Sequence, residues 1–175
     1  EKLQKALSDE ERKVIVVYGR RRIGKSSLVK KALRLETSED IYFQADETNT
    51  SNQLFLLAKS IASVFPSFDA VIYPDWRALF EALNYRVTTP CTLCLDEFPY
   101  LCKSCPSLPS ILQDLLDNTT LRFNLILCGS SQQLMYSEVL SEKSPLYGRA
   151  DMIMKMQPIS LSFIQEAMDL TDAKE

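Results

Sequence analysis

The amino-acid sequence predicts a three-layer α/β fold with a mainly parallel five-stranded sheet flanked by helices. Strand-like and helix-like segments alternate along the 175 residues, and this alternation is typical of parallel strands joined by helical crossovers. Several strand-like segments are short apolar runs, as in strands that are buried on both faces of a sheet. The length suits one ordinary domain, which can bury a core without disulfides or a structural metal.

The five strands are predicted from these short runs. The first, 14–18, is apolar throughout and rich in β-branched residues, and the second covers 40–45. The third, 91–95, runs directly into Asp96 and Glu97, and the fourth, 123–128, ends at Gly129. A fifth strand is expected at 150–156. Because parallel sheets bind their ligands beyond the carboxyl ends of the strands, the residues directly after each strand are the candidates for chemistry.

The helices are predicted from apolar residues that recur at intervals of three and four. They are expected at 26–35, 51–65, 75–83, 108–116, 131–139 and 162–168. The second begins at an N-cap, either Ser51 or Asn52, and stops before Pro66. Asp75 is the expected N-cap of the third helix.

The composition excludes several classes of enzyme. The chain has no histidine, which removes Ser-His-Asp and Cys-His nucleophile systems, histidine metal ligands and histidine pH switches. Only 4 residues are glycine, against about 12 expected from average usage. Each glycine is therefore expected where the backbone requires one, and Gly19 and Gly24 lie within one six-residue stretch.

The charge is unevenly distributed along the chain. The net charge is −3, from 20 basic and 23 acidic residues, which argues against a dedicated nucleic-acid coat or a polybasic membrane anchor. One stretch of fifteen residues is nevertheless basic and contains no acid. Its cations are Arg20, Arg21, Arg22, Lys25, Lys30, Lys31 and Arg34. A basic stretch in an acidic chain indicates a local anionic ligand.

The cysteines indicate a reduced protein rather than a zinc site. Five is an odd number, and the sequence shows neither a secretory leader nor a long apolar run, so we expect a cytoplasmic protein without a membrane partner. Cys91-x-x-Cys94 and Cys102-x-x-Cys105 have zinc-ribbon spacing. Cys91 and Cys94 fall within a predicted strand, however, where residues three apart point to opposite faces. We therefore interpret Cys94 as a core residue.

A phosphate-binding loop follows the first strand. The segment 19–26, GRRRIGKS, matches G-x-x-x-x-G-K-[ST] and lies between a buried strand and an amphipathic helix, as this motif requires. Gly19 allows a sharp turn off the strand, and Gly24 allows the backbone to approach the phosphates. Backbone amides and the helix N-terminus would surround the β-phosphate, Lys25 would reach the β- and γ-oxygens, and Ser26 would ligate Mg²⁺. The nucleotide-binding residues predicted from this loop are Gly19, Arg20, Arg21, Arg22, Ile23, Gly24, Lys25, Ser26 and Ser27.

An acidic pair follows the third strand, at the same predicted edge of the sheet. A small-residue apolar strand ending in Asp-Glu is the Walker B pattern, here Asp96 and Glu97. Asp96 is expected to hold Mg²⁺, usually through water. Glu97 is expected to orient and deprotonate the attacking water. An alternative is that the two carboxylates only cap the next segment.

Two further positions are candidates for sensing the γ-phosphate. Ser130 and Ser131 follow the fourth strand and could contact the γ-phosphate or the attacking water, although a serine after a glycine also serves as a helix cap. Arg149 precedes the fifth strand and is a candidate charge sensor or arginine finger, in cis or across a subunit interface. A solvated surface arginine is the alternative.

Taken together, these segments resemble the prokaryotic and archaeal AAA+-related P-loop ATPases, the archaeal-ATPase group near the STAND class. The resemblance is carried by GRRRIGKSSL at 19–28, IYFQA at 41–45, LDEFPYL at 95–101, LCGSS at 127–131 and PLYGR at 145–149. It implies ATP as nucleotide, Mg²⁺ as metal, and a sheet with the Walker B and sensor strands between the first strand and one edge. It also implies a helical lid, which this chain is expected to lack, so that 1–175 is an ATPase core without its lid or C-terminal domain.

The leading hypothesis is a cytoplasmic Mg-ATP-dependent ATPase core that works as a nucleotide switch, with Glu97, Lys25 and Arg149 as catalytic residues. One alternative is a P-loop kinase for a small metabolite, which would need an arginine-rich lid that the sequence does not show. Another is an ATP-dependent scaffold that binds a protein partner or DNA, or a homo-oligomer formed through regions outside the chain. The net charge does not support DNA binding.

Overall fold

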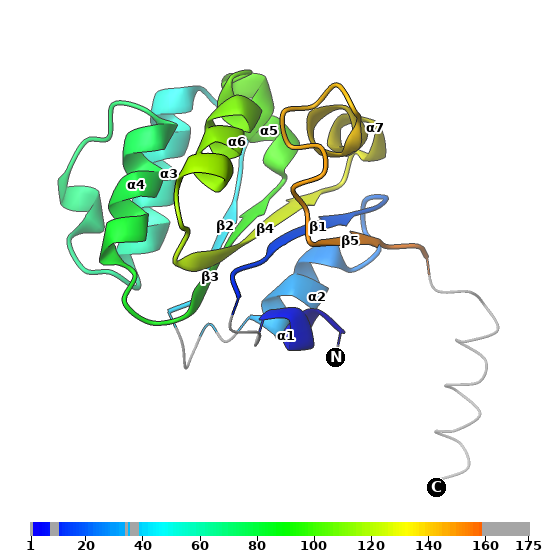
Figure 1. The fold of residues 1–175 in the computed structure, drawn as a ribbon, viewed down its shortest axis with the longest axis horizontal. Helices are drawn as coiled ribbons and strands as arrows, with labels where there is room; N and C mark the ends of the chain where they lie inside the picture. The colour runs from blue at the N-terminus through cyan, green and yellow to red at the C-terminus, as the bar shows by residue number, and fades with distance from the viewer. Residues whose placement is uncertain (1, 8–10, 34, 36–38, 159–175) are drawn as a thin grey trace, which may run out of the picture.

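In a computed structural model, the chain forms a five-stranded sheet in the order β2-β3-β4-β1-β5 (Figure 1). The structure describes residues 2–7, 11–33, 35 and 39–158. The strands are β1 (Val14–Tyr18), β2 (Ile41–Gln44), β3 (Cys91–Asp96), β4 (Phe123–Gly129) and β5 (Met152–Lys155). Every paired strand is parallel to its neighbour. The predicted fold class is therefore confirmed, and β3 and β4 lie between β1 and the β2 edge as the resemblance implied.

Helices cover both faces of the sheet, which gives the three predicted layers (Figure 1). One face carries α3 (Thr50–Ala62), α4 (Trp76–Arg86), α5 (Phe98–Ser104), α6 (Leu108–Asn118) and α7 (Gln132–Met135). Two shorter turns, η1 (Phe68–Ala70) and the π-helical η2 (Tyr136–Leu140), belong to the same layer. The other face carries α1 (Lys2–Leu7) and α2 (Lys25–Ala32). None of the helices in the described ranges has the length and apolar content needed to cross a membrane.

The side chains of the central strands alternate between two hydrophobic clusters, as the period of a strand requires. Val16 of β1 and Leu127 of β4 pack in the larger cluster, under α3–α7. Ile15 and Ile126 pack in the smaller cluster, against α1 and α2. Cys94 also belongs to the smaller cluster and is fully buried, so its predicted place in the core is confirmed.

Several predicted boundaries differ from the structure at element ends. α2 begins at Lys25 and ends at Ala32, and α3 is capped by Asn49, whose side chain accepts from the amide of Asn52. The predictions of Ser51 or Asn52 as the cap were therefore wrong by two or three residues. Asp75 does cap α4, by accepting a hydrogen bond from the amide of Ala78. The helix predicted at 162–168 lies outside the described residues.

Two helices were absent from the predictions, α1 and α5. The α5 segment is apolar and carries a proline at its start, where the missing amide hydrogen costs nothing.

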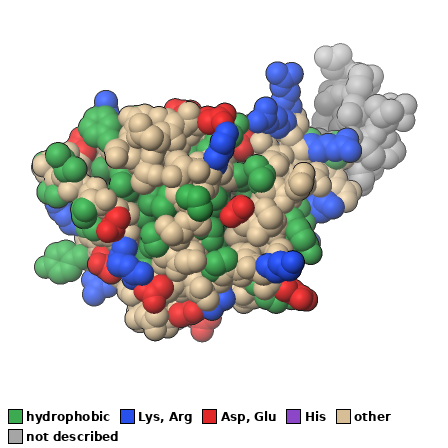
Figure 2. Space-filling view, turned by 90° about the horizontal axis from the view of Figure 1, so that it is seen from above, with side chains coloured by type: hydrophobic (Ala, Val, Ile, Leu, Met, Phe, Trp, Pro, Cys, Tyr) green, Lys and Arg blue, Asp and Glu red, His purple; other side chains and the backbone are tan. Residues whose placement is uncertain are grey.

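Figure 2 shows the face formed by the helices drawn uppermost in Figure 1, on which acidic and basic side chains are interspersed with hydrophobic ones. Neither charge forms one continuous patch on that face.

Candidate functional site

The loop between β1 and α2 has the geometry of a phosphate cradle. A Cβ on Gly19 would lie 2.5 Å from the carbonyl oxygen of Met156, so the chain that follows β5 requires a glycine at this position. Gly24 has φ 88° and ψ 15°, in the left-handed region, and serves as the N-cap of α2 without a side-chain cap. The first amides of α2 therefore face the cleft with no capping side chain, as anion-binding helix termini do.

Lys25 is folded back over this loop. Its side chain is only 5% exposed, and Nζ donates a 2.8 Å hydrogen bond to the carbonyl oxygen of Arg20. The ammonium group is thereby held within the loop by a backbone acceptor. A phosphate oxygen could replace that acceptor without unfolding any element.

Ser26 and Asp96 meet at the carboxyl end of β3. The Ser26 hydroxyl donates a 2.6 Å hydrogen bond to Oδ2 of Asp96, and the backbone amide of Glu97 donates to Oδ1 at 2.9 Å. Tyr42 of β2 donates its hydroxyl to the same Oδ2. Asp96 is 1% exposed, so these donors provide the solvation that water would otherwise supply.

These contacts set the charge state of the buried aspartate. Burial by itself raises the pKa of Asp96, but hydrogen bonds from Ser26, Tyr42 and the Cys128 thiol outweigh it and hold that pKa below its usual value. The pKa of Tyr42 is raised, first by burial and then by its bond to Asp96. Asp96 is therefore a carboxylate and Tyr42 a neutral donor at neutral pH.

The two oxygens at this position suit a magnesium ion. A serine hydroxyl and a carboxylate are hard oxygen ligands of the kind that Mg²⁺ prefers. Within the described ranges, no group of three or more Asp, Glu, Cys or His side chains is placed to hold a metal by itself. The site thus fits an ion that takes its remaining ligands from water and phosphate, rather than a caged structural metal.

Glu97 begins α5 in an unusual backbone conformation. Its φ of 55° and ψ of 43° are left-handed, which is uncommon for a residue with a side chain and is found disproportionately at functional sites. The carboxylate accepts hydrogen bonds from the Ser130 amide at 3.2 Å and the Ser130 hydroxyl at 2.9 Å. The residue directly after β4 thus fixes the direction of the glutamate.

Arg21 connects the loop to this pair. Its Nε donates to the Ser130 hydroxyl at 3.4 Å, and its Nη2 donates to the hydroxyl of Tyr100 at 3.0 Å. A cleft of about 500 Å³ lies between these groups. It is lined by Arg21, Arg22, Gly24, Lys25, Ser26, Ser27, Glu97 and Ser130. Three segments predicted separately, the loop, the acidic pair and the first serine after β4, therefore share one hollow.

Six of the residues predicted for the site are not among those that line the cleft, and two of them, Gly19 and Asp96, have been described above. Arg20 contributes its carbonyl oxygen to Lys25, and Ile23 is half-buried beneath the loop beside Gly19. Ser131 is the N-cap of α7 and accepts from the amide of Leu134, which is the alternative role that its sequence context offered. These three support the loop or a helix rather than facing the hollow.

Arg149 is the last of these six residues, and it is paired elsewhere. Nε and Nη2 donate to the two carboxylate oxygens of Asp117 on α6 at 2.9 and 2.6 Å. Nη1 donates to the carbonyl oxygens of Pro145 and Tyr147. The guanidinium therefore ties the 145–149 loop to α6, and the pKa of Asp117 is lowered by this contact.

Tyr42 and Tyr100 were missing from the sequence-based site. The register of β2 and β3 pairs Gln44 with Asp96 and Tyr42 with Cys94, so Tyr42 lies on the same face of the sheet as Asp96. The alternation of side chains along the strands could have indicated Tyr42, but only if β2 and β3 were known to be neighbours. The Lys30 ammonium lies 4.4 Å from the centre of the Tyr42 ring and places a cation beside the same cluster.

Comparison with known proteins agrees with this geometry. The model of a family described as an ATPase domain predominantly from Archaea matches residues 1–175. The uncharacterized protein MJECL04 of Methanocaldococcus jannaschii is 35% identical over 168 residues. That alignment includes 94% of this chain but only 35% of the relative, so the chain spans about a third of that protein.

Solved structures share the fold at low sequence identity. The Walker-type ATPase paby2304 of Pyrococcus abyssi is 20% identical, with a TM-score of 0.73 over 98% of this chain and 58% of that one. The ORC1 protein of Aeropyrum pernix, solved in complex with DNA, is 17% identical, with a TM-score of 0.68 over 99% and 48%. The RuvB Holliday junction branch migration motor of Thermotoga maritima is 17% identical, with a TM-score of 0.54 over 98% and 49%.

Proposed function

The chain belongs to the family of ATPase domains found predominantly in Archaea, and on this premise we propose that it binds ATP with Mg²⁺ and hydrolyses it as a nucleotide-controlled switch. The observation that carries the proposal is the shared cleft. Lys25, Ser26, Glu97 and Ser130, which come from three separate segments of the chain, line one hollow beyond the carboxyl ends of the strands.

In this proposal the triphosphate lies along the 19–26 loop. The uncapped amides of α2 bind the β-phosphate, and Lys25 exchanges the Arg20 carbonyl oxygen for β- and γ-oxygens. Ser26 and Asp96, already in contact, would hold Mg²⁺, Ser26 directly and Asp96 through water. The metal, when bound, neutralises charge that develops on the phosphate oxygens.

Glu97 is the proposed general base. Its carboxylate would accept a proton from a water aligned for in-line attack on the γ-phosphate. In the structure the same carboxylate is held by the amide and hydroxyl of Ser130. Ser130 would thus orient the base, and Arg21, which contacts the Ser130 hydroxyl, would report the presence of the γ-phosphate to that pair.

Arg149 enters the proposal only as a candidate charge sensor. It would have to leave Asp117 to meet a nucleotide, in its own subunit or in a neighbouring copy.

Substitution of the proposed base tests hydrolysis separately from binding. Glu97→Gln should keep the affinity for Mg-ATP within a few-fold, because the carboxylate does not bind the phosphates, and should lower single-turnover hydrolysis by about 10²–10⁴. Glu81→Gln, on the exposed side of α4, is the matched control and should hydrolyse ATP normally. Unimpaired hydrolysis by Glu97→Gln would remove Glu97 from the mechanism.

A further inference from the structure

A second and larger cavity, of about 740 Å³, lies at the opposite end of the sheet from the nucleotide cleft. Val14 and Phe123, which line it, are the first residues of β1 and β4, and Pro90, also lining it, directly precedes β3. Because the strands are parallel, the amino ends of these three strands share one edge. The cavity is therefore separate from the loop that follows β1.

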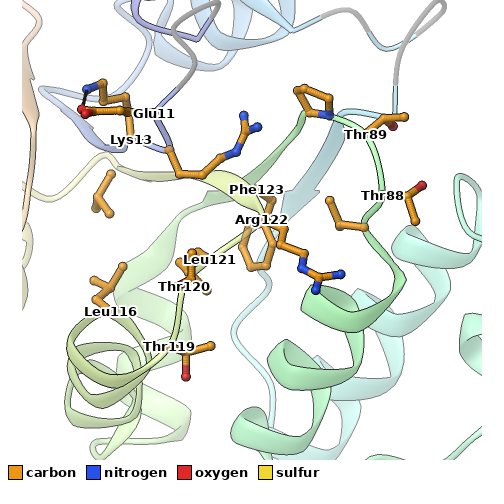
Figure 3. Close-up of a pocket in the computed structure, with 14 residues that line it drawn as sticks. Glu11, Lys13, Thr88, Thr89, Leu116, Thr119, Thr120, Leu121, Arg122 and Phe123 are labelled. Carbon is orange, nitrogen blue, oxygen red and sulfur yellow. Dashed lines mark hydrogen bonds and ion pairs between the residues drawn. The ribbon is translucent and has the colours of Figure 1, made fainter.

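The walls of this cavity come from three connections that are far apart in sequence. Figure 3 shows three groups of residues around one hollow. They are Glu11 and Lys13 before β1, Thr88 and Thr89 before β3, and the segment 116–123, which runs from the last turn of α6 to the first residue of β4. Val87 and Phe123 are buried and give this hollow an apolar floor. Its size and mixed lining are those of small-molecule sites, which lie in the range of roughly 300–1,000 Å³.

The charge of the lining is positive. Arg12, Lys13 and Arg122 are its cations and Glu11 is its one acid. The Lys13 ammonium pairs with Glu11 at 3.1 Å. The remaining cations of the lining are the guanidinium groups of Arg12 and Arg122. The Thr89 hydroxyl is already engaged, since it donates to Oε2 of Glu39.

Arg12 is the group that most clearly lacks a partner. Its Nη1 is inaccessible to solvent and has no hydrogen-bond partner among the described residues. A ligand in the cavity cannot reach this shielded nitrogen, but Arg12 as a whole is only half-buried, so the rest of its guanidinium is open to the cavity. Guanidinium donors without an acceptor are costly and are normally matched by an anion or an ordered water. The Arg122 backbone amide is held by Asn84 at 2.7 Å, so the position of this residue is fixed, while its exposed guanidinium has no ion pair among the described residues.

We propose that this cavity is a binding site for a small organic oxyanion, a phosphate or carboxylate carried on an apolar, ring-sized body. Arg12 and Arg122 bind the anionic group, and the apolar floor at Val87 and Phe123 receives the body. The geometry favours arginine for this task, because its fork of donors matches the paired oxygens of a phosphate or carboxylate. The site does not depend on the proposed ATPase activity.

Direct titration with defined probes tests this site. The probes are 1-naphthyl phosphate and 1-naphthoate, with the neutral 1-naphthalenemethanol as comparator, and naphthalene fluorescence reports binding. We expect saturable binding of at least one anionic probe and at least tenfold weaker binding of the neutral compound. The stronger of the two anions identifies the preferred oxyanion.

Matched variants locate the binding. Arg12→Gln should weaken binding of the anionic probe at least tenfold and Arg122→Gln at least threefold, whereas Arg12→Lys, which keeps the charge but lacks the fork of donors, should recover only part of the affinity. Lys59→Gln, an exposed cation on α3, should leave the affinity unchanged. Lys25→Ala should also leave it unchanged, because the probe does not occupy the phosphate loop.

Three results would overturn the proposal: equal binding of the neutral compound, affinity unaffected by both arginine substitutions, or affinity lost in Lys25→Ala. The last would assign the probe to the nucleotide cleft. If Arg12→Gln does not fold, the exposed Arg122→Gln carries the test, with circular dichroism to check that the variant is native.

Discussion

The two ends of the sheet handle their charged groups in opposite ways. At the carboxyl end, Lys25 has a backbone acceptor, Asp96 has four hydrogen-bonded neighbours and Glu97 is held by Ser130. At the amino end, a buried nitrogen of Arg12 has no acceptor in the part of the chain that the structure describes, although the cavity there is the larger of the two. The more tightly bonded end carries the sequence motifs.

This difference teaches that polar groups of the protein itself can occupy the positions of ligand atoms, and so hold the side chains of a binding site in place before the ligand binds. The Arg20 carbonyl oxygen stands where an acceptor for Lys25 is needed, and Ser26 bonds to Asp96 with the oxygen that it would offer to a metal. Binding then exchanges partners without reorganising the fold, which keeps the side chains in place and limits the cost of ordering them. At the amino end nothing in the described chain performs this substitution for Arg12.

The largest expected effect on the carboxyl end of the sheet is a loss of nucleotide affinity when Gly24 is replaced by alanine, with Gly148 as the matched position. Gly24 and Gly148 both have left-handed backbones, with φ of 88° and 73°, and a Cβ at either would meet nothing within 4 Å. Alanine should therefore cost each protein the same backbone strain, about 1–2 kcal/mol. Only Gly24→Ala should also lose nucleotide affinity, at least tenfold, because its Cβ enters the space proposed for phosphates.

Calorimetric titration of Mg-ATP into both variants, with urea denaturation of each, measures the two effects separately. Equal ATP affinity in Gly24→Ala and Gly148→Ala would show that the phosphates do not approach Gly24.

An effect on stability alone, without a loss of nucleotide affinity as large as that of Gly24→Ala, is expected from Tyr42→Phe. The variant removes one hydrogen bond to a buried carboxylate and should lower the free energy of unfolding by about 1.5–3 kcal/mol. Tyr85→Phe, on an exposed tyrosine of α4, is the control and should change stability by less than about 0.5 kcal/mol. Equal stability of the two variants in urea would indicate that the carboxyl-end network does not depend on its internal bonds.

The smallest effect is expected from Arg149→Ala. Its hydrogen bonds to Asp117 lower the pKa of that carboxyl, so the stabilisation is complete above the ordinary aspartate pKa of about 4 and is lost as the pH falls through the lowered value. At pH 7 the Tm should drop by no more than ~4 °C. The difference from the unsubstituted protein should become smaller in acid, where only the hydrogen bonds of Nη1 to the Pro145 and Tyr147 carbonyls are left.

Thermal unfolding across that pH range checks this, and a difference in Tm that stayed the same size in acid would contradict the ion-pair explanation. Hydrolysis by the folded Arg149→Ala protein is a separate readout. An unchanged rate would leave Arg149 as a structural tie between α6 and the 145–149 loop.

Much of the fold was predictable because its determinants are local. The apolar run of β1, the glycine-containing loop and the Asp-Glu pair after β3 each identify themselves within a few residues, and chain topology then brings strand ends to one edge. α5 was not predicted, because an apolar segment with an early proline shows no clear helical period before its packing is known.

The partners of individual side chains were less accessible. Tyr42 depends on the neighbour relation of β2 and β3, and the pairing of Arg149 with Asp117 joins residues 32 positions apart. The reason for Gly19 was also non-local, since the group that excludes a side chain there is the Met156 carbonyl after β5. Sequence patterns locate a site in such cases, while tertiary packing decides which polar groups bond within it.

The central claim is that the 19–26 loop binds a nucleoside triphosphate through Lys25. Calorimetric titration of Mg-ATP into the unsubstituted chain and into Lys25→Ala tests it most directly, with Lys59→Gln as the charge-matched control. We expect saturable binding by the first and third proteins and a loss of at least tenfold in Lys25→Ala, in line with the roughly 1.5–3 kcal/mol of a charge-assisted hydrogen bond. Equal affinity in all three proteins would contradict the account.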